Sequence, residues 1–301
     1  MRINTNISSL GAQEAAQNTN KSIANSLEKL STGLKINKAS DDASGLAIAD
    51  KLRTQVTSIN QGISNGNSAI ALLQIADKSM AEQGKILDTI KSKLIQANTD
   101  TTSSVGRIAI AKDVNKLLDQ LNNIAKQTNY NGTALLQKGM GSATTDTASS
   151  AGLTFQIGES NTDIISTKSI QANVSGYSLN ALKSAVSAGA SATISSDGKT
   201  VTANGFERSL ASAGQSAIDN AITKLNGFRG DIGSTQNQVE SAVRNLMTQS
   251  TNIKAAESII RDVDYAEESA NFNKLNIISQ AGSYAISQSN ATQQNVLRLL
   301  Q

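Results

Sequence analysis

Large apolar residues recur at alternating spacings of four and three over residues 52–94, and this pattern constrains the fold more than any other feature of the chain. Nine of the thirteen positions sampled by this spacing are large and apolar. A mean spacing of 3.5 residues keeps one stripe of an α-helix facing a neighbour, as in a coiled coil or a helical bundle. Such a helix would extend about 65 Å at 1.5 Å per residue. A helix that folds back into an ordinary bundle is the alternative.

Residues 218–260 repeat the same spacing with the same density, again nine apolar positions of thirteen. Two stretches of equal length on either side of an intervening segment are expected to lie against each other as a pair of antiparallel rods. The apolar stripe of each rod is called its seam. The residues predicted to form it are Leu52, Val56, Ile59, Ile63, Ile70, Leu73, Leu87, Leu94, Ile222, Leu225, Val239, Val243 and Leu246.

The composition favours long helices. The chain of 301 residues contains no proline, so nothing forces a long helix to break. Aromatic residues make up only 3%, and a large compact core would therefore have to come from aliphatic side chains alone. The predicted fold class is mainly α, with long antiparallel helical rods, paired terminal helices and a small β-hairpin insertion.

Both ends of the chain are amphipathic and poorly equipped to fold alone. Burial of their few apolar side chains gains less free energy than the ordering of some forty residues costs. We therefore expect the ends to become ordered on association with other copies, the alternative being frayed termini packed on their own bundle. The predicted self-assembly residues are Ile3, Ile7, Leu10, Ile23, Leu27, Leu30, Leu34, Phe272, Leu275, Ile278, Ile286, Val296, Leu297, Leu299 and Leu300.

Local signals divide the chain further. Gly33 is expected to end the first helix and Ser40 to cap the next one. A third helix around residues 110–124 is expected to end at the turn Asn131-Gly132. From Leu153 onward, apolar residues alternate with polar ones, which predicts strands. The expected domains are residues 1–42 with 258–301 (terminal helices), 43–139 with 208–257 (rods), and 140–207, a β-containing, Ser/Thr-rich insertion that faces solvent.

Several function classes are disfavoured by the sequence. Histidine and cysteine are absent, and no serine lies in a recognisable catalytic motif, so no enzyme activity, cofactor or metal is expected. The net charge of +3 is spread out without interleaved aromatics, which argues against nucleic acid. No apolar stretch approaches eighteen residues, and the start lacks a signal-peptide core.

Asp262 and Asp264 could suggest a cation site, but pairing of these carboxylates with Lys or Arg at the surface is favoured. The tripeptide 229–231 (RGD) is interpreted as coincidence.

The chain closely resembles bacterial flagellin, in a short form similar to those of ε-class bacteria. The motifs that carry this resemblance follow the family's order along the chain. They are residues 1–6 (MRINTN), 30–37 (LSTGLKIN), 40–49 (SDDASGLAIA), 129–133 (NYNGT), 153–158 (LTFQIG), 260–266 (IRDVDYA) and 294–297 (QNVL).

The resemblance implies a structural subunit that polymerises head-to-tail with copies of itself into the helical tube of the flagellar filament, for swimming motility. It also implies an extracellular location reached by type III export without a signal peptide, and an export chaperone, a cap and hook-junction proteins as partners. A hook-filament junction protein is the alternative within this class. A soluble coiled-coil signalling or adhesion module is the alternative from another class.

Two positions depart from the family pattern. Gln293 stands where a proline usually precedes the last motif, so the final helix is expected to continue. Many flagellins carry Leu-Gln-Arg-Val-Arg-Glu-Leu, which a Toll-like innate receptor reads, whereas here the matching stretch begins at Leu87. Weak or absent receptor activation is therefore expected from the altered residues Asp88, Thr89, Ile90, Lys91 and Ser92.

Overall fold

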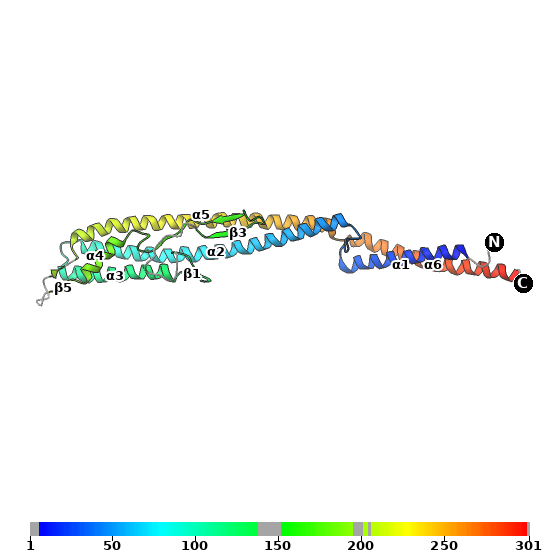
Figure 1. The fold of residues 1–301 in the computed structure, drawn as a ribbon, viewed down its shortest axis with the longest axis horizontal. Coiled ribbons are helices and arrows are strands. Elements are labelled where there is room, and N and C mark those ends of the chain that lie inside the picture. The colour runs from blue at the N-terminus through cyan, green and yellow to red at the C-terminus, as the bar shows by residue number, and fades with distance from the viewer. Residues whose placement is uncertain (1–5, 138–151, 195–200, 204–205, 300–301) are drawn as a thin grey trace. The chain divides into compact units, whose positions relative to one another are not determined.

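In the computed structural model the chain is mainly α-helical, which confirms the predicted class (Figure 1). The structure describes residues 6–137, 152–194, 201–203 and 206–299. The helices are α1 (Ile7–Thr32), α2 (Ala43–Ala97), α3 (Ser104–Gln127), α4 (Asn180–Ala190), α5 (Arg208–Arg261) and α6 (Tyr265–Leu299). Three antiparallel hairpins join β1 (Asn129–Tyr130) to β2 (Thr133–Ala134), β3 (Thr154–Gln156) to β4 (Ile164–Ser166), and β5 (Thr193–Ile194) to β6 (Val201–Ala203).

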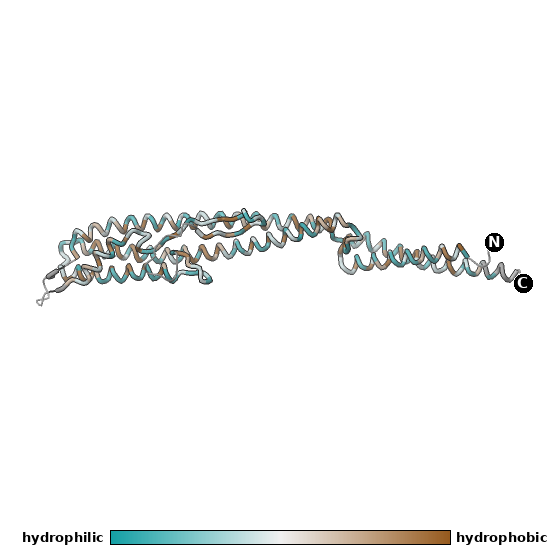
Figure 2. The backbone as a smooth tube through the Cα atoms, viewed as in Figure 1, coloured by the Kyte–Doolittle hydropathy of each residue, from teal (hydrophilic) through white to brown (hydrophobic). Residues whose placement is uncertain are grey.

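The helices form two compact units. The first comprises Met1–Thr57 and Gln249–Gln301, and the second comprises Ser58–Thr248. In the first unit α1 and α6 pack side by side (Figure 1). In the second unit α3 and α4 pack together, and the main hydrophobic cluster draws on α2, α3, α4 and α5. Apolar and polar residues are interspersed along the long helices (Figure 2).

The two predicted seams meet in the second unit, where one polar position of each pairs with the other. Asp77 of α2 interrupts the first seam and Arg229 of α5 interrupts the second, and the Arg229 Nε lies 2.8 Å from an Asp77 carboxylate oxygen. This hydrogen bond raises the pKa of Arg229. The small residue Gly66 lies opposite Val243, whose methyl group fills the space of a missing Cβ. The charged interruption of one seam is thus paired with that of the other, and the space left by Gly66 is filled by Val243.

The predicted seam residues are either buried or half-buried in the structure. Val56, Ile59, Leu73, Leu87, Leu94, Leu225, Val239 and Val243 are buried, whereas Leu52, Ile63, Ile70, Ile222 and Leu246 are half-buried. The hairpin β3–β4 covers part of this stripe, because Ile157 joins a small cluster with Ala69 and Val239. Gly62 permits this approach, since a Cβ there would overlap the Ile157 carbonyl.

A buried amide ties three segments of the second unit together. Gln83 of α2 is fully buried, and its Nε2 donates hydrogen bonds to the carbonyl oxygens of Ala172 (2.7 Å) and Leu121 (3.2 Å). Its Oε1 accepts a hydrogen bond of 2.8 Å from the Tyr177 hydroxyl. Burial raises the pKa of Tyr177. Every polar atom of the Gln83 side chain is therefore paired, which makes the amide compatible with an apolar core.

Two expectations from the sequence are wrong. The segment 140–207 was expected to face solvent, yet Tyr177, Leu182 and Val186 are buried in the main cluster, and the segment contains helix α4. The expected cap at Ser40 is replaced by Asp42, whose Oδ1 accepts a hydrogen bond of 2.9 Å from the Gly45 amide. The division into three domains stays a prediction.

Candidate functional site

The paired terminal helices are held in register by a sparse set of polar contacts. Helix α1 begins after Asn6, whose Oδ1 accepts a hydrogen bond of 3.0 Å from the Ser9 amide. The Asn6 Nδ2 also donates to the Ser289 hydroxyl of α6 at 3.3 Å. Further along, the Ser26 hydroxyl donates to Glu268 at 2.5 Å. Because these contacts lie near opposite ends of α1, they fix how the two helices align.

Very little of α1 is buried within the chain. Ser26 is the one buried residue among its 26 residues, all of which the structure describes. The side chains of Ile7 and Leu10 are 68% and 65% exposed, and Leu27 is 54% exposed. A helix with this much apolar surface in water gains almost no stability from burial on its own.

The predicted self-assembly residues divide into exposed and half-buried groups. Ile7, Leu10, Leu27 and Ile278 are exposed, and Ile23, Leu30, Leu34, Phe272, Leu275 and Ile286 are half-buried. Val296, Leu297 and Leu299 lie on α6, which runs through Gln293 as expected. Ile3 and Leu300 lie outside the described residues. The assignment of this set to self-assembly is a prediction that the placement of the residues alone does not test.

Four further large side chains of the first unit are exposed and are absent from the predicted set. Ile259 (84%), Tyr265, Ile277 and Tyr284 (72%) present their side chains to solvent at the end of α5 and along α6. Ile259, Ile277 and Tyr284 fall outside the four-three spacing, whereas Tyr265 lies seven residues before Phe272 and so fits it. A search for large apolar residues outside that frame would have found the first three.

The two connectors of the first unit pair through their backbones. The Lys35 amide donates to the Arg261 carbonyl at 2.7 Å, and the Val263 amide donates to the Gly33 carbonyl at 3.0 Å. Gly33 ends α1 as predicted, in the left-handed region at φ 75°. The connector from α1 to α2 is thereby joined to the connector from α5 to α6.

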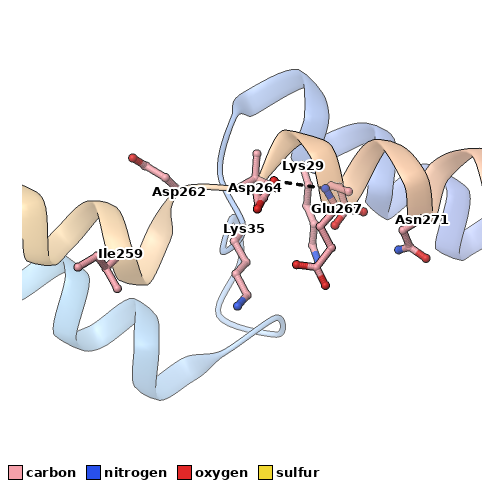
Figure 3. Close-up of a pocket in the computed structure, with 9 residues that line it drawn as sticks. Lys29, Lys35, Ile259, Asp262, Asp264, Glu267 and Asn271 are labelled. Atoms are coloured by element: carbon pink, nitrogen blue, oxygen red, sulfur yellow. Dashed lines mark hydrogen bonds between the residues drawn. The ribbon is translucent and has the colours of Figure 1, made fainter.

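Beside these connectors lies a hollow lined by charged side chains (Figure 3). Four carboxylates and two lysines surround it, and Asp262, Asp264 and Glu268 already accept hydrogen bonds within the first unit. Asp264 caps α6 by accepting from the Ala266 amide at 2.9 Å, and Asp262 accepts from the Ser258 hydroxyl at 2.6 Å. Among the described residues, no group of three or more acidic side chains is arranged to hold a metal ion. The hollow is therefore interpreted as part of the joint.

The stretch expected to meet an innate receptor lies on α2 in the second unit. Ile90 is fully buried, and Asp88, Thr89 and Ser92 are exposed. Lys91 forms an ion pair of 2.6 Å with Asp219 of α5. The exposed face of this stretch thus offers one carboxylate and two hydroxyls, with no free guanidinium.

The charged residues of the tripeptide at 229–231 form ion pairs within the second unit. Arg229 pairs with Asp77, and Asp231 lies 2.8 Å from Lys168. Both charged ends of the tripeptide are engaged within the second unit, on helix α5. This arrangement agrees with the interpretation of the motif as coincidence.

Comparison with known proteins identifies the family. Residues 3–143 match the family model of the bacterial flagellin N-terminal helical region, and residues 215–300 match that of the bacterial flagellin C-terminal helical region. The flagellin of Bacillus subtilis strain 168 is 35% identical over 316 residues, across the full length of both chains. The chain belongs to the bacterial flagellin family.

Other relatives agree with this assignment. The flagellar filament 33 kDa core protein of Treponema phagedenis is 32% identical over 300 residues, again across both full lengths. The structure of a putative flagellar hook-associated protein from Vibrio parahaemolyticus has a TM-score of 0.58 at 13% identity, and the match covers 73% of this flagellin and 99% of that protein. At that identity the likeness shows a shared fold alone.

The family assignment establishes the role of this flagellin. It is a structural subunit of the bacterial flagellar filament, which lies outside the cell, and it polymerises with copies of itself. The alternative of a hook-filament junction protein is not favoured, because the family models match both terminal regions and the flagellins match at full length. Across the described part of the chain, no helix is both long and apolar enough to span a membrane.

Proposed function

We propose that the exposed apolar side chains of α1 and α6 are the surface through which each copy packs against its neighbours in the filament. The observation that carries this proposal is the contrast within α1, where Ser26 is buried while Ile7, Leu10 and Leu27 face water. Contacts of this kind between different patches of successive copies are heterologous, so they propagate as a helical fibre.

Polymerisation of a double variant tests the proposal. Ile7→Ser combined with Leu10→Ser removes two side chains whose burial in the filament would each contribute about 1.5–3 kcal/mol. The critical concentration for polymerisation is expected to rise by at least about a hundredfold, while the circular dichroism of the unassembled chain stays unchanged. Sedimentation separates polymer from monomer, and the concentration left in the supernatant gives the critical concentration.

A matched control comes from the second unit. Ile95→Ser combined with Ile164→Ser replaces two isoleucines of comparable exposure, 52% and 49%. This variant is expected to keep a critical concentration near that of the unchanged protein. The proposal is rejected if the Ile7/Leu10 variant polymerises as readily as the unchanged protein.

The same proposal includes specific binding partners and an export route. An export chaperone, a filament cap and hook-junction proteins are expected to bind this flagellin, and it is expected to leave the cell by type III export without a cleavable signal. These expectations are supported by the resemblance of the terminal motifs to those of other flagellins.

We further propose that this flagellin activates the Toll-like innate receptor weakly. The exposed residues Thr89 and Ser92 stand where the recognised motif carries an arginine and a glutamate, and Lys91 is held by Asp219. Exchange of these residues for Arg and Glu (Thr89→Arg, Ser92→Glu) is expected to raise potency in a cell reporter assay.

The receptor proposal also has a matched control on the same helix. Thr57 is exposed and its hydroxyl donates to a backbone carbonyl four residues earlier, as does that of Thr89. Thr57→Arg therefore adds the same charge as the single change Thr89→Arg, and it is expected to leave potency unchanged. Full potency of the unchanged protein would reject the proposal.

A further inference from the structure

The turn between β1 and β2 combines an asparagine with a following glycine at an exposed position. Tyr130 and Thr133 are the last paired residues of the hairpin, so Asn131 and Gly132 form a two-residue turn. Both have positive φ, 49° and 82°, which is typical of a type I′ turn. Both are exposed, and a Cβ at Gly132 would meet nothing within 4 Å.

This dipeptide has the groups needed for an intramolecular reaction. The backbone nitrogen of Gly132 attacks the Asn131 side-chain carbonyl carbon Cγ, a new N–Cγ bond forms, and the Cγ–Nδ2 bond breaks. The amide proton of Gly132 leaves with the side-chain nitrogen as ammonia. Water then opens the resulting succinimide at either carbonyl, which gives aspartate or an isoaspartate linkage through the side chain. Glycine favours the attack because it carries no Cβ that would hinder it.

The amide that must attack is free in this turn. Among the described residues, the Gly132 amide donates no hydrogen bond to a backbone carbonyl outside the helices and strands. The adjoining strands contain two residues each, so little pairing opposes the backbone rotation that brings nitrogen to Cγ. The turn is therefore open to the reaction in the folded chain.

The same dipeptide occurs in two helices, where the structure opposes the reaction. Asn65-Gly66 lies within α2 and Asn226-Gly227 within α5. Inside a helix the glycine amide donates to a carbonyl four residues earlier, and the backbone cannot rotate without local unfolding. Asn65 is held further, since its Nδ2 donates to the Gln156 carbonyl at 3.0 Å. A fourth pair, at 204–205, lies outside the described residues.

We propose that Asn131 is a site of spontaneous deamidation, selected from chemically identical dipeptides by its place in an exposed turn. The product adds one negative charge, and the isoaspartate form adds one atom to the backbone of a two-residue turn. The change is confined to the turn, because the Leu135 amide bonds to the Thr128 carbonyl at 3.2 Å and both Leu135 and Leu136 are buried. This site is independent of the proposed assembly surface.

Peptide mapping of the aged, folded protein tests this proposal. The full chain is incubated unassembled at mildly alkaline pH, and mass spectrometry follows the conversion of amide to acid and to isoaspartate at each dipeptide. Asn131 is expected to convert at least about tenfold faster than Asn65 and Asn226, because only the helical sites need local unfolding first. In denaturant the three rates are expected to converge.

Two results would overturn the proposal. The first is a rate at Asn131 in the folded chain no higher than the rates at Asn65 and Asn226. The second is a difference between the sites that persists after unfolding, which would assign the selection to flanking sequence instead of the fold. Either result leaves the polymerisation experiments on Ile7 and Leu10 unaffected.

Discussion

Gln83 shows how a single polar residue can be accommodated in an aliphatic core. Its amide meets two carbonyls and the Tyr177 hydroxyl, so no buried donor or acceptor of the side chain is left without a partner. The alternating spacing of apolar residues predicted the seam around Gln83 and gave no indication of this network. The partners come from α3 and from the segment around residue 172, which only the tertiary structure brings together.

We expect removal of the Tyr177 hydroxyl to destabilise the second unit. Tyr177→Phe leaves the Gln83 Oε1 buried without a donor, so the free energy of unfolding of the second unit is expected to fall by about 1–3 kcal/mol. Tyr130→Phe is the matched control, because Tyr130 is exposed and its hydroxyl has no partner among the described residues. That change is expected to stay within about 0.5 kcal/mol. Denaturant unfolding measures both, and equal losses would contradict the account.

At the scale of elements, the sequence predicted the long helices well and the short ones poorly. The seams of α2 and α5 follow from spacing alone, because long periodic stretches carry many repeats of one signal. Helix α4 was missed inside a segment rich in serine and alanine, although Leu179, Leu182 and Val186 carry helical spacing. The sequence predicts the cap of α2 at Ser40, whereas in the structure Asp42 accepts the hydrogen bond from the Gly45 amide.

Two glycines of the first unit are expected to respond in opposite ways to replacement by alanine. Gly33 ends α1 at φ 75°, and a Cβ there would lie 2.9 Å from the Tyr265 hydroxyl. Gly33→Ala is therefore expected to lower the thermal stability of the α1–α6 pair, at a cost of about 1–3 kcal/mol. Gly11 lies inside α1 with open space around it, so Gly11→Ala is expected to stabilise α1 by about 0.5–1 kcal/mol.

Thermal unfolding followed by circular dichroism measures both glycine variants in the unassembled chain. The two replacements add the same methyl group to the same element, so the comparison removes any general effect of alanine. A Gly33 variant as stable as the Gly11 variant would contradict the role assigned to the left-handed cap.

At the scale of the whole molecule, burial is distributed unevenly between the two units. The second unit contains the main hydrophobic cluster, whereas α1 of the first unit buries Ser26 alone. The sequence predicted this asymmetry from the shortage of apolar side chains at the ends. It could not predict the polar contacts that align α1 with α6, because asparagine and serine pairs such as Asn6 and Ser289 leave no periodic signal.

Amide hydrogen exchange on the unassembled chain and on the polymer tests most directly whether the terminal helices depend on neighbouring copies. In the unassembled chain the amides of α1 and α6 are expected to exchange much faster than those of α3, because few buried contacts oppose local opening. In the filament the same amides are expected to become slow. Slow exchange throughout α1 and α6 in the dilute, unassembled chain would contradict the account.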